Sequence, residues 1–430
     1  MDDKASVQLN RLTRENQRLH RAVDELSVLN EIATAISSTL SLNKIIRLVV
    51  QKCVKHLNVE QAAVMILDQQ ASDKPFQTMV RHADTTSEIL PYRLDTQLTG
   101  WMLKNRQPLV INDLHSDERF LSVVTDDVPI RSLLSVPLLS KGEMIGIITV
   151  FNKKDGEFTV EGQRLLSIIA TQSTQVIENA RLLEEEQALF RVQEEMRMAK
   201  DIQMNLLPQN MPQIAGYDIA GMSIPAKAVG GDYFDFIEMN AHHLAFCLGD
   251  GTGKGLPAAM LMANTQATIR GQSLLLKSPK NCIQNANQLM YHSTGLGKFV
   301  TLFYGILDTE KHQLLYCNAG HDTPMLFHRD QTVERLDIGG VVLGFVPQFE
   351  YAEATIPLQP GDCLVIYSDG VTEAMNAKED EFGEARLQEL ILNHRQLTAQ
   401  ELIDKIVTSV RTHAGDTPQS DDITLLVVKR

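Results

Sequence analysis

The chain has 430 residues, of which 43% are hydrophobic and 22% are charged, values typical of a soluble globular protein with two or three domains. Its formal net charge of −14 argues against binding to nucleic acid or to an anionic membrane surface. Five scattered cysteines without Cys-x-x-Cys spacing predict reduced, buried thiols. Because no apolar run is long enough to cross a bilayer, and the N-terminus lacks an apolar signal segment, we expect no membrane span and a cytoplasmic location.

The first 30 residues carry the spacing of a coiled coil. Apolar residues alternate at three and four positions, and two asparagines fall on the same seam. Buried asparagine pairs favour a parallel, in-register homodimer, and the alternative is an amphipathic helix that packs on its own domain. The seam consists of Leu9, Leu12, Asn16, Leu19, Val23, Leu26, Asn30 and Ala33.

Residues 31–180 alternate helical and strand patterns, with KGE as a hairpin turn between two apolar strands. A helix, an antiparallel sheet of five or six strands and a closing helix indicate an α+β sensor module. The phrases NDLHSDERF, SLLSVPLL and GIITVFNKKDGEFT resemble those of GAF domains. The resemblance implies a module that receives a small-molecule or protein signal, although NKKD lacks the rest of the signature of GAF domains that bind cyclic nucleotides. A ligand-free module for dimerisation and relay is the alternative.

From Thr159 to Leu206 the chain has no proline and a single glycine, which predicts one helix running through a linker at residues 181–210. Two heptad seams follow one another with an offset of about one residue. A coil with two competing registers is bistable, so we expect a dimeric linker that carries a signal to the C-terminal domain, and a plain dimerisation stalk is the alternative. The first seam is Leu166, Ile169, Ser173, Val176, Ala180, Leu183, Gln187 and Phe190, and the second is Leu189, Val192, Met196, Ala199, Gln203 and Leu206.

Short strand patterns dominate residues 211–430, after Pro208 and Pro212 end the long helix. Helical stretches lie between these strands, and the mixture predicts two packed sheets flanked by helices. For the whole chain we therefore expect an α+β protein with a coiled coil at residues 1–30, a GAF-type sensor domain at 31–180, a helical linker at 181–210 and a sandwich domain at 211–430.

A group of aspartates stands at turns in the C-terminal domain, most of them next to an apolar strand pattern. A single aspartate at a turn is usually structural, as an Asx-turn or a helix cap. Several carboxylates at strand ends around one cleft are instead the ligands of hard divalent cations, and they repel one another unless positive charge lies between them. The sequence therefore predicts a metal site with more than one ion. The aspartates are Asp232 in GGDYFD, Asp250 in LGDGTGKG, Asp369 in YSDG, and Asp421 and Asp422 in SDDITLLVV.

These segments partly resemble several other known motifs, but their spacing or context excludes each of them. GGDYF differs by one letter from GGDEF, the signature of diguanylate cyclases, but a cyclase would leave Asp250, Asp369 and Asp421 without a role. LGDGTGKG has neither P-loop spacing nor the pattern G-x-G-x-x-G. The chain also lacks the Cys-x5-Arg pocket of tyrosine phosphatases and a Gly-x-Ser-x-Gly elbow.

Taken together, the motifs from about Met196 to Arg430 resemble the PPM (protein phosphatase 2C-like) superfamily, and within it the bacterial SpoIIE/RsbU-type serine phosphatases. They are AKDIQMNLLP, PAKAVGGDYFD, LGDGTGKGLPAAM, NAGHDTPML, GDCLVIYSDGVTEAMN, FGEARL and SDDITLLVV, in the order of the family. The resemblance implies an α-β-β-α sandwich with metal ions at one end. One departure is Gly251-Thr252, where many bacterial members have Val-Ser.

The resemblance also implies a role for each residue of the site. Asp250 would bridge two ions, Mn²⁺ or Mg²⁺, and the Gly251 carbonyl would ligate one of them. Asp369 and Asp421 would complete the shell of the other ion, while Asp232 would hold metal-bound waters or ligate directly. A metal-activated water would then hydrolyse phosphoserine or phosphothreonine without a covalent phosphoenzyme.

Two further residues and the partner complete these expectations. Lys227, just before VGGD, is a candidate phosphate contact, and strand alternation points Asp422 away from Asp421. By resemblance, the phosphorylated partner is a STAS-type anti-sigma factor antagonist. The alternative is a catalytically silent sensor and scaffold that binds a phosphoprotein, against which the complete set of aspartates argues.

Overall fold

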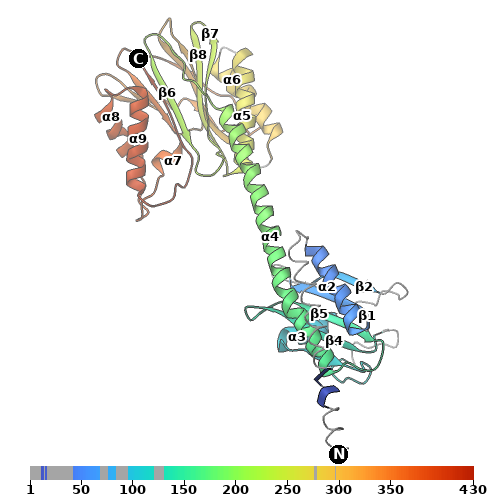
Figure 1. Cartoon of the computed structure of the whole chain (residues 1–430). Helices are drawn as coiled ribbons and strands as arrows, with labels where there is room; N and C mark the ends of the chain where they lie inside the picture. The colour runs from blue at the N-terminus through green and yellow to red at the C-terminus, as the bar shows by residue number, and fades with distance from the viewer. Residues whose placement is uncertain are drawn as a thin grey trace, which may run out of the picture. The chain divides into compact units, whose positions relative to one another are not determined.

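The computed structural model describes residues 11–13, 15–16, 42–67, 76–83, 95–120, 130–275, 278–295 and 297–430. The chain divides into two compact units, Met1–Arg191 and Val192–Arg430 (Figure 1). Most of the predicted N-terminal coiled coil lies outside the described residues, so that prediction is not confirmed. Among the described residues, no helix combines the length and the apolar character needed to cross a bilayer.

The first unit contains helices α2 (Leu42–Leu57) and α3 (Asp95–Asn105), and helix α4 (Val160–Leu206) begins in it. Its strands are β1 (Val59–Leu67), β2 (Phe76–Ala83), β3 (Leu109–Ile111), β4 (Leu133–Ser140) and β5 (Glu143–Lys153). In the described part of this unit the strands form one five-stranded antiparallel sheet in the order β2-β1-β5-β4-β3. Ser140 pairs with Glu143 across a two-residue turn, Lys141 and Gly142, whose φ angles of 48° and 87° are both positive. The predicted hairpin is therefore confirmed.

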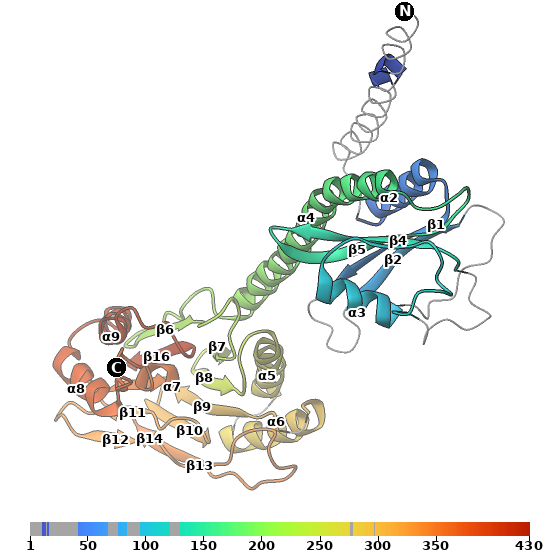
Figure 2. The same ribbon diagram turned by 90° about the horizontal axis from the view of Figure 1, so that it is seen from below.

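Helices cover both faces of this sheet, with α2 and α4 on one face and α3 on the other (Figure 2). Strand alternation sorts the side chains between the two faces: Val64 and Ile66 pack with α2 and α4, whereas Met65 packs with α3. The α4 residues Leu166, Ile169, Ser173, Val176 and Ala180 are all buried.

The burial of these five residues bears on the predicted linker coil, because they are the first five of the eight residues of its first seam. The four apolar ones belong to the same core cluster as α2, so they pack within their own domain rather than against a second chain. Further along α4, Leu182, Leu183, Leu189 and Phe190 are each more than half exposed. A two-chain coiled coil can therefore form only along the later part of α4.

The second unit contains two sheets and the C-terminal helices. Its strands are β6 (Asp218–Ile224), β7 (Tyr233–Asn240), β8 (His243–Gly251), β9 (Val300–Asp308), β10 (Gln313–Ala319), β11 (Met325–Phe327), β12 (Val333–Arg335), β13 (Gly339–Gly340), β14 (Ala354–Pro357), β15 (Cys363–Tyr367) and β16 (Ile423–Lys429). Its helices are α5 (Leu256–Leu275), α6 (Pro279–Ser293), α7 (Asp369–Thr372), α8 (Glu384–His394) and α9 (Ala399–Ala414). One sheet has the order β13-β10-β9-β8-β7, with β14 also paired to β10, and the other has the order β12-β11-β15-β16-β6.

These elements form four layers, with α5 and α6 on one outer side and α8 and α9 on the other (Figure 1). The alternation of side chains on β16 shows the layering directly. Leu426 and Val428 belong to the core between the two sheets, whereas Leu425 and Val427 belong to the core beneath α9. The predicted α-β-β-α sandwich is confirmed. All five cysteines are free and buried, as the sequence predicted.

Candidate metal centre

The predicted aspartates all lie at one end of the sandwich. Asp232 directly precedes β7, and Asp250 lies near the end of β8, which pairs antiparallel with β7. In the other sheet Asp369 begins α7 just after β15, and Asp421 lies just before the paired strand β16. Because antiparallel pairs bring the start of one strand beside the end of its neighbour, four separate segments deliver these carboxylates to one place.

The carboxylates act on one another electrostatically. Burial, followed by the charges of Asp369 and Asp421, raises the pKa of Asp250 to about 7. Burial and then the charge of Asp421 raise the pKa of Asp369. Burial and then the charge of Asp250 raise the pKa of Asp232 well above its ordinary value. The group is therefore held together at an electrostatic cost, which a bound cation would offset.

The arrangement fits a divalent cation by its donor chemistry, although the side chains do not form a closed ligand shell. Within the described ranges, no three acidic, histidine or cysteine side chains converge closely enough to hold a metal. The Oδ2 atom of Asp232 is buried and, among the described residues, accepts no hydrogen bond. The ammonium of Lys254 instead contacts Asp421, with Nζ 2.8 Å from Oδ2, and donates to the Ser420 carbonyl at 2.7 Å. Water molecules, or a rotation of the side chains, would have to complete the shell of an ion held here.

Asp422 holds the loop that precedes Asp232. Its carboxylate accepts hydrogen bonds from the backbone N–H groups of Ala226 at 2.7 Å, Gly231 at 2.6 Å and Asp232 at 3.3 Å. A Cβ atom at Gly230 would lie 2.3 Å from the Asp422 Oδ2, so only glycine fits there. The sequence predicted only that Asp422 points away from Asp421, and it did not indicate the role of Asp422 in fixing the loop.

The same loop packs directly against the Asp250 segment. A Cβ atom at Gly231 would lie 2.7 Å from the Gly251 carbonyl oxygen and 3.5 Å from Asp250 Oδ1. The glycine pair therefore lets the backbone before Asp232 approach the proposed bridging carboxylate and the Gly251 carbonyl.

Gln203 holds this loop from the other side. The side chain of Gln203 is buried, donates to the carbonyl of Gly230 and accepts from its N–H. The sequence placed Gln203 on the second coiled-coil seam, where it would face a partner helix. That placement is wrong for this position, because the amide is already paired inside its own domain.

The candidate phosphate contact Lys227 is an exposed side chain at the glycine-rich turn after Asp250. Its Cδ lies 3.8 Å from the position of a Cβ on Gly255, and Lys298 Nζ lies 3.4 Å from the corresponding position on Gly253. Both glycines have positive φ angles, 75° and 100°. With Lys254, these side chains bring positive charge to the turn, and of the three lysines only Lys227 was predicted from the sequence.

A histidine and a further acidic residue also border the site. Nδ1 of His321 lies 2.9 Å from the hydroxyl of Thr301, and that hydroxyl accepts from the Asp250 N–H at 3.2 Å. Burial lowers the pKa of His321 to about 4, so its ring is neutral at pH 7. Burial and the charge of Asp369 raise the pKa of Asp322 to about 6. Neither role was predicted from the sequence, and the signal for both residues is the His-Asp pair that follows the apolar strand β10.

Comparisons with known proteins agree with this architecture. Residues 39–178 match the GAF domain model, and residues 240–430 match the model for Stage II sporulation protein E (SpoIIE). Phosphoserine phosphatase RsbU of Bacillus subtilis (strain 168) is 32% identical over 253 residues, which cover 57% of this chain and 74% of RsbU. Protein IcfG of Synechocystis sp. (strain ATCC 27184 / PCC 6803 / Kazusa) is 29% identical over 264 residues, which cover 55% of this chain and 41% of IcfG.

A solved structure supports the fold of the C-terminal unit. The SiaA-PP2C domain of Pseudomonas aeruginosa is 22% identical and superimposes with a TM-score of 0.51, over 56% of this chain and 98% of that domain. The fold and the strand-end aspartates define a PP2C-type phosphatase domain preceded by a GAF domain. The chain belongs to the SpoIIE/RsbU family of protein serine/threonine phosphatases.

Proposed function

We propose that the chain hydrolyses phosphoserine or phosphothreonine on a partner protein with the help of two divalent ions, Mn²⁺ or Mg²⁺. One observation carries the proposal. Aspartates from four separate segments meet at one end of the sandwich, where Asp250 has a pKa raised to about 7 by burial and by its acidic neighbours. Such a group of carboxylates is costly to keep together unless cations bind to it.

Each residue of the site would have its own role. Asp250, Asp369, Asp421 and the Gly251 carbonyl would hold the ions, and Asp232 would hold their waters or bind directly. When bound, divalent ions lower the pKa of water and neutralise charge on phosphoryl oxygens. The loop before Asp232 is fixed by Asp422, so the geometry at this end of the site is set by the chain itself. The exposed Lys227, beside the glycine-rich turn, would attract the anionic substrate.

The proposed substrate is a phosphorylated STAS-type anti-sigma factor antagonist. The support is membership in the family of RsbU, which is a phosphoserine phosphatase. With a net charge of −14, the chain needs local positive charge to attract an anionic partner, and the lysines beside the site would provide it.

Regulation is proposed to run through a parallel dimer and α4. The helix begins against the core of the GAF domain, and near its other end Gln203 holds Gly230, two residues before Asp232. A small-molecule or protein signal at the GAF domain would change the register of the exposed part of α4 and thereby shift this loop. We propose domain boundaries at residues 1–30, 31–180, 181–210 and 211–430.

The test is phosphate release from a phosphorylated STAS-domain protein in the presence of Mn²⁺ or Mg²⁺, with EDTA as the control. We expect metal-dependent hydrolysis by the full chain and a loss of at least a hundredfold in Asp250→Asn, because the bridging charge is removed. An inactive wild type, or an Asp250→Asn variant as active as wild type, would favour the silent scaffold instead.

A further inference from the structure

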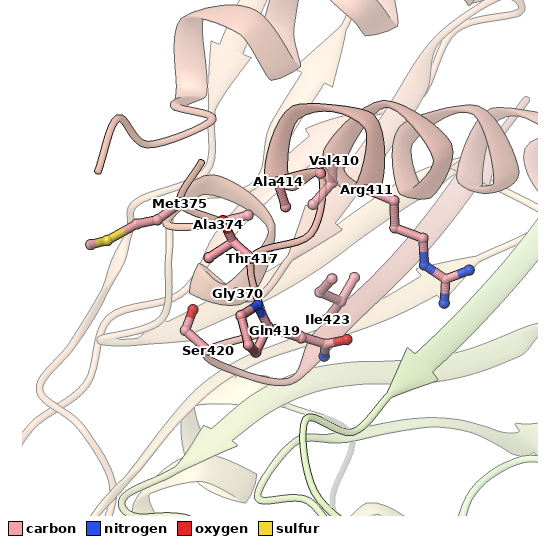
Figure 3. Close-up of a pocket in the computed structure, with 12 residues that line it drawn as sticks. Gly370, Ala374, Met375, Val410, Arg411, Ala414, Thr417, Gln419, Ser420 and Ile423 are labelled. Carbon is pink, nitrogen blue, oxygen red and sulfur yellow. The ribbon is translucent and has the colours of Figure 1, made fainter. Parts of the chain in front are cut away.

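A pocket of about 160 Å³ opens beside the candidate metal centre (Figure 3). It lies between α7, the last turn of α9, the loop that follows α9 and the start of β16. Its inner wall is made of the buried side chains of Ala374, Val410 and Ile423 and the backbone of Gly370. Ala414, one turn after Val410 on α9, also lines the pocket, and Met375, which is 42% exposed, lies at the rim.

The walls of the pocket are held by hydrogen bonds and close packing. Helix α9 ends at Ala414, after which Gly415 takes a φ of 60°, and the Thr417 N–H donates to the Ala414 carbonyl at 3.1 Å. Gln419 Nε2 donates to the carbonyls of Ile224 at 2.9 Å and Asp421 at 2.7 Å. The loop between α9 and β16 is thereby tied at both ends, so the pocket is part of the folded structure rather than a gap in a loose segment.

The chemistry of the lining favours an apolar occupant of limited size. The buried lining residues are aliphatic, and no buried charged side chain lines the pocket. The one charged residue of the lining, Arg411, is exposed, and Figure 3 shows its guanidinium directed away from the other lining residues. Pockets that enclose whole small molecules usually measure roughly 300 to 1,000 Å³. A pocket of this volume matches a single large aliphatic or aromatic side chain, and the flexible thioether of Met375 can adapt to its shape.

The position of the pocket identifies the molecule that would supply this side chain. Gly370 directly follows Asp369, and Ser420 directly precedes Asp421. The direct chain neighbours of two candidate metal ligands therefore line the pocket. A protein that brings its phosphate to these aspartates must cover the adjoining surface, which a free phosphate ester is too small to reach.

We propose that this pocket is a docking subsite for one bulky apolar side chain of the phosphoprotein substrate, close to its phosphorylated residue. The inference rests on the proposed phosphatase function and adds a determinant of substrate choice to it. Large side chains buried in well-packed pockets at the centre of an interface can carry much of the binding energy, so this contact would act on the affinity for the protein substrate and not on the chemical step.

The test compares two substrates of the full chain in the presence of Mn²⁺. One is a phosphorylated STAS-domain protein, and the other is p-nitrophenyl phosphate, which has no side chain to dock. Ala414→Phe fills the pocket, and Ala377→Phe makes the same change at an exposed position outside it. We expect Ala414→Phe to raise the KM for the phosphoprotein by about tenfold or more, because the burial of a large apolar side chain is lost. The kcat and the hydrolysis of p-nitrophenyl phosphate should stay unchanged, and Ala377→Phe should match wild type throughout.

A second variant, Met375→Ala, removes an exposed wall of the pocket without adding volume, and it should raise the same KM several-fold.

Equal KM values for wild type and both pocket variants would overturn the docking subsite while leaving the phosphatase proposal intact. Parallel losses on both substrates would also overturn it, because they would show that the change distorts the metal centre. A change in molar mass by light scattering would assign the pocket to self-association instead. A wild type inactive on both substrates would overturn the phosphatase proposal itself, and the docking role with it.

Discussion

Gln203 and Gly230 exchange two hydrogen bonds: Gln203 Nε2 donates to the Gly230 carbonyl at 2.7 Å, and Gln203 Oε1 accepts from the Gly230 N–H at 3.0 Å. The glutamine belongs to α4, and the glycine belongs to the loop that ends at Asp232. A displacement of the end of α4 must therefore move this loop or leave two buried backbone groups unpaired, at a cost of about 1 to 3 kcal/mol for each.

The first prediction concerns this contact. Gln203→Leu keeps the approximate volume but removes both hydrogen bonds, so we expect the loop to lose its fixed position. Mn²⁺ affinity measured by calorimetry should fall by about tenfold, in line with the cost of an unpaired buried group. The matched control is Gln187→Leu, which changes an exposed glutamine of the same helix. Equal affinities in the two variants would contradict a positioning role for Gln203.

The second prediction separates the neighbouring acids Asp421 and Asp422. Asp422 is buried and accepts three backbone N–H groups, so Asp422→Ala should lower the free energy of unfolding by about 2 to 4 kcal/mol. Asp421 contributes to the repulsion that raises the pKa of Asp250, and Asp421→Asn should cost little stability in metal-free buffer. Urea unfolding in EDTA measures both values. The opposite ranking would show that Asp421 is the structural member of the pair.

The third prediction is a pH dependence of stability. The folded-state pKa of Asp250, about 7, lies above the ordinary aspartate value of 3.8, so folding favours the protonated form. The stabilising contribution of this group is complete below about pH 4 and is lost as the pH rises through 7. Without metal, the difference in unfolding free energy between Asp250→Asn and wild type should therefore grow in favour of the variant from pH 5 to pH 8. Urea titrations in EDTA at several pH values check this, and a difference independent of pH would contradict it.

The fourth prediction concerns the exposed apolar residues of α4. Leu182 and Leu189, and likewise Leu183 and Phe190, are seven residues apart, the spacing of a coiled-coil seam. In a parallel, in-register dimer, equivalent residues lie opposite one another. Leu183→Cys or Phe190→Cys should then form an intermolecular disulfide under mild oxidation.

The control for this experiment is Arg191→Cys, which lies on another face of α4 and should remain monomeric on non-reducing gels. A cross-link with the same yield at all three positions would indicate random collision. No cross-link at any of them would contradict the parallel dimer.

The sandwich and the clustering of its aspartates could be predicted because strand alternation and strand-end motifs are local signals. Heptad spacing was less informative. Leu166 and Val176 follow the spacing of a two-chain seam, yet they pack with α2 inside their own domain, because a helix buried by any neighbour shows the same period. The same heptad spacing wrongly predicted that Gln203 faces a partner helix, for the same reason. The roles of Asp422 and Lys254 depend on contacts with residues far apart in the sequence, about which the motifs carry no information.

The five native cysteines have a practical consequence for studying α4. All five are buried, and burial raises the pKa of the Cys53 thiol to about 12 and that of Cys282 to about 11. Alkylating reagents and spin labels react with thiolates and hardly with thiols. We therefore expect the native cysteines of the folded chain to react very slowly with them at neutral pH. Probes placed on single introduced cysteines can therefore report on α4 in an otherwise native sequence, with no need for a cysteine-free background.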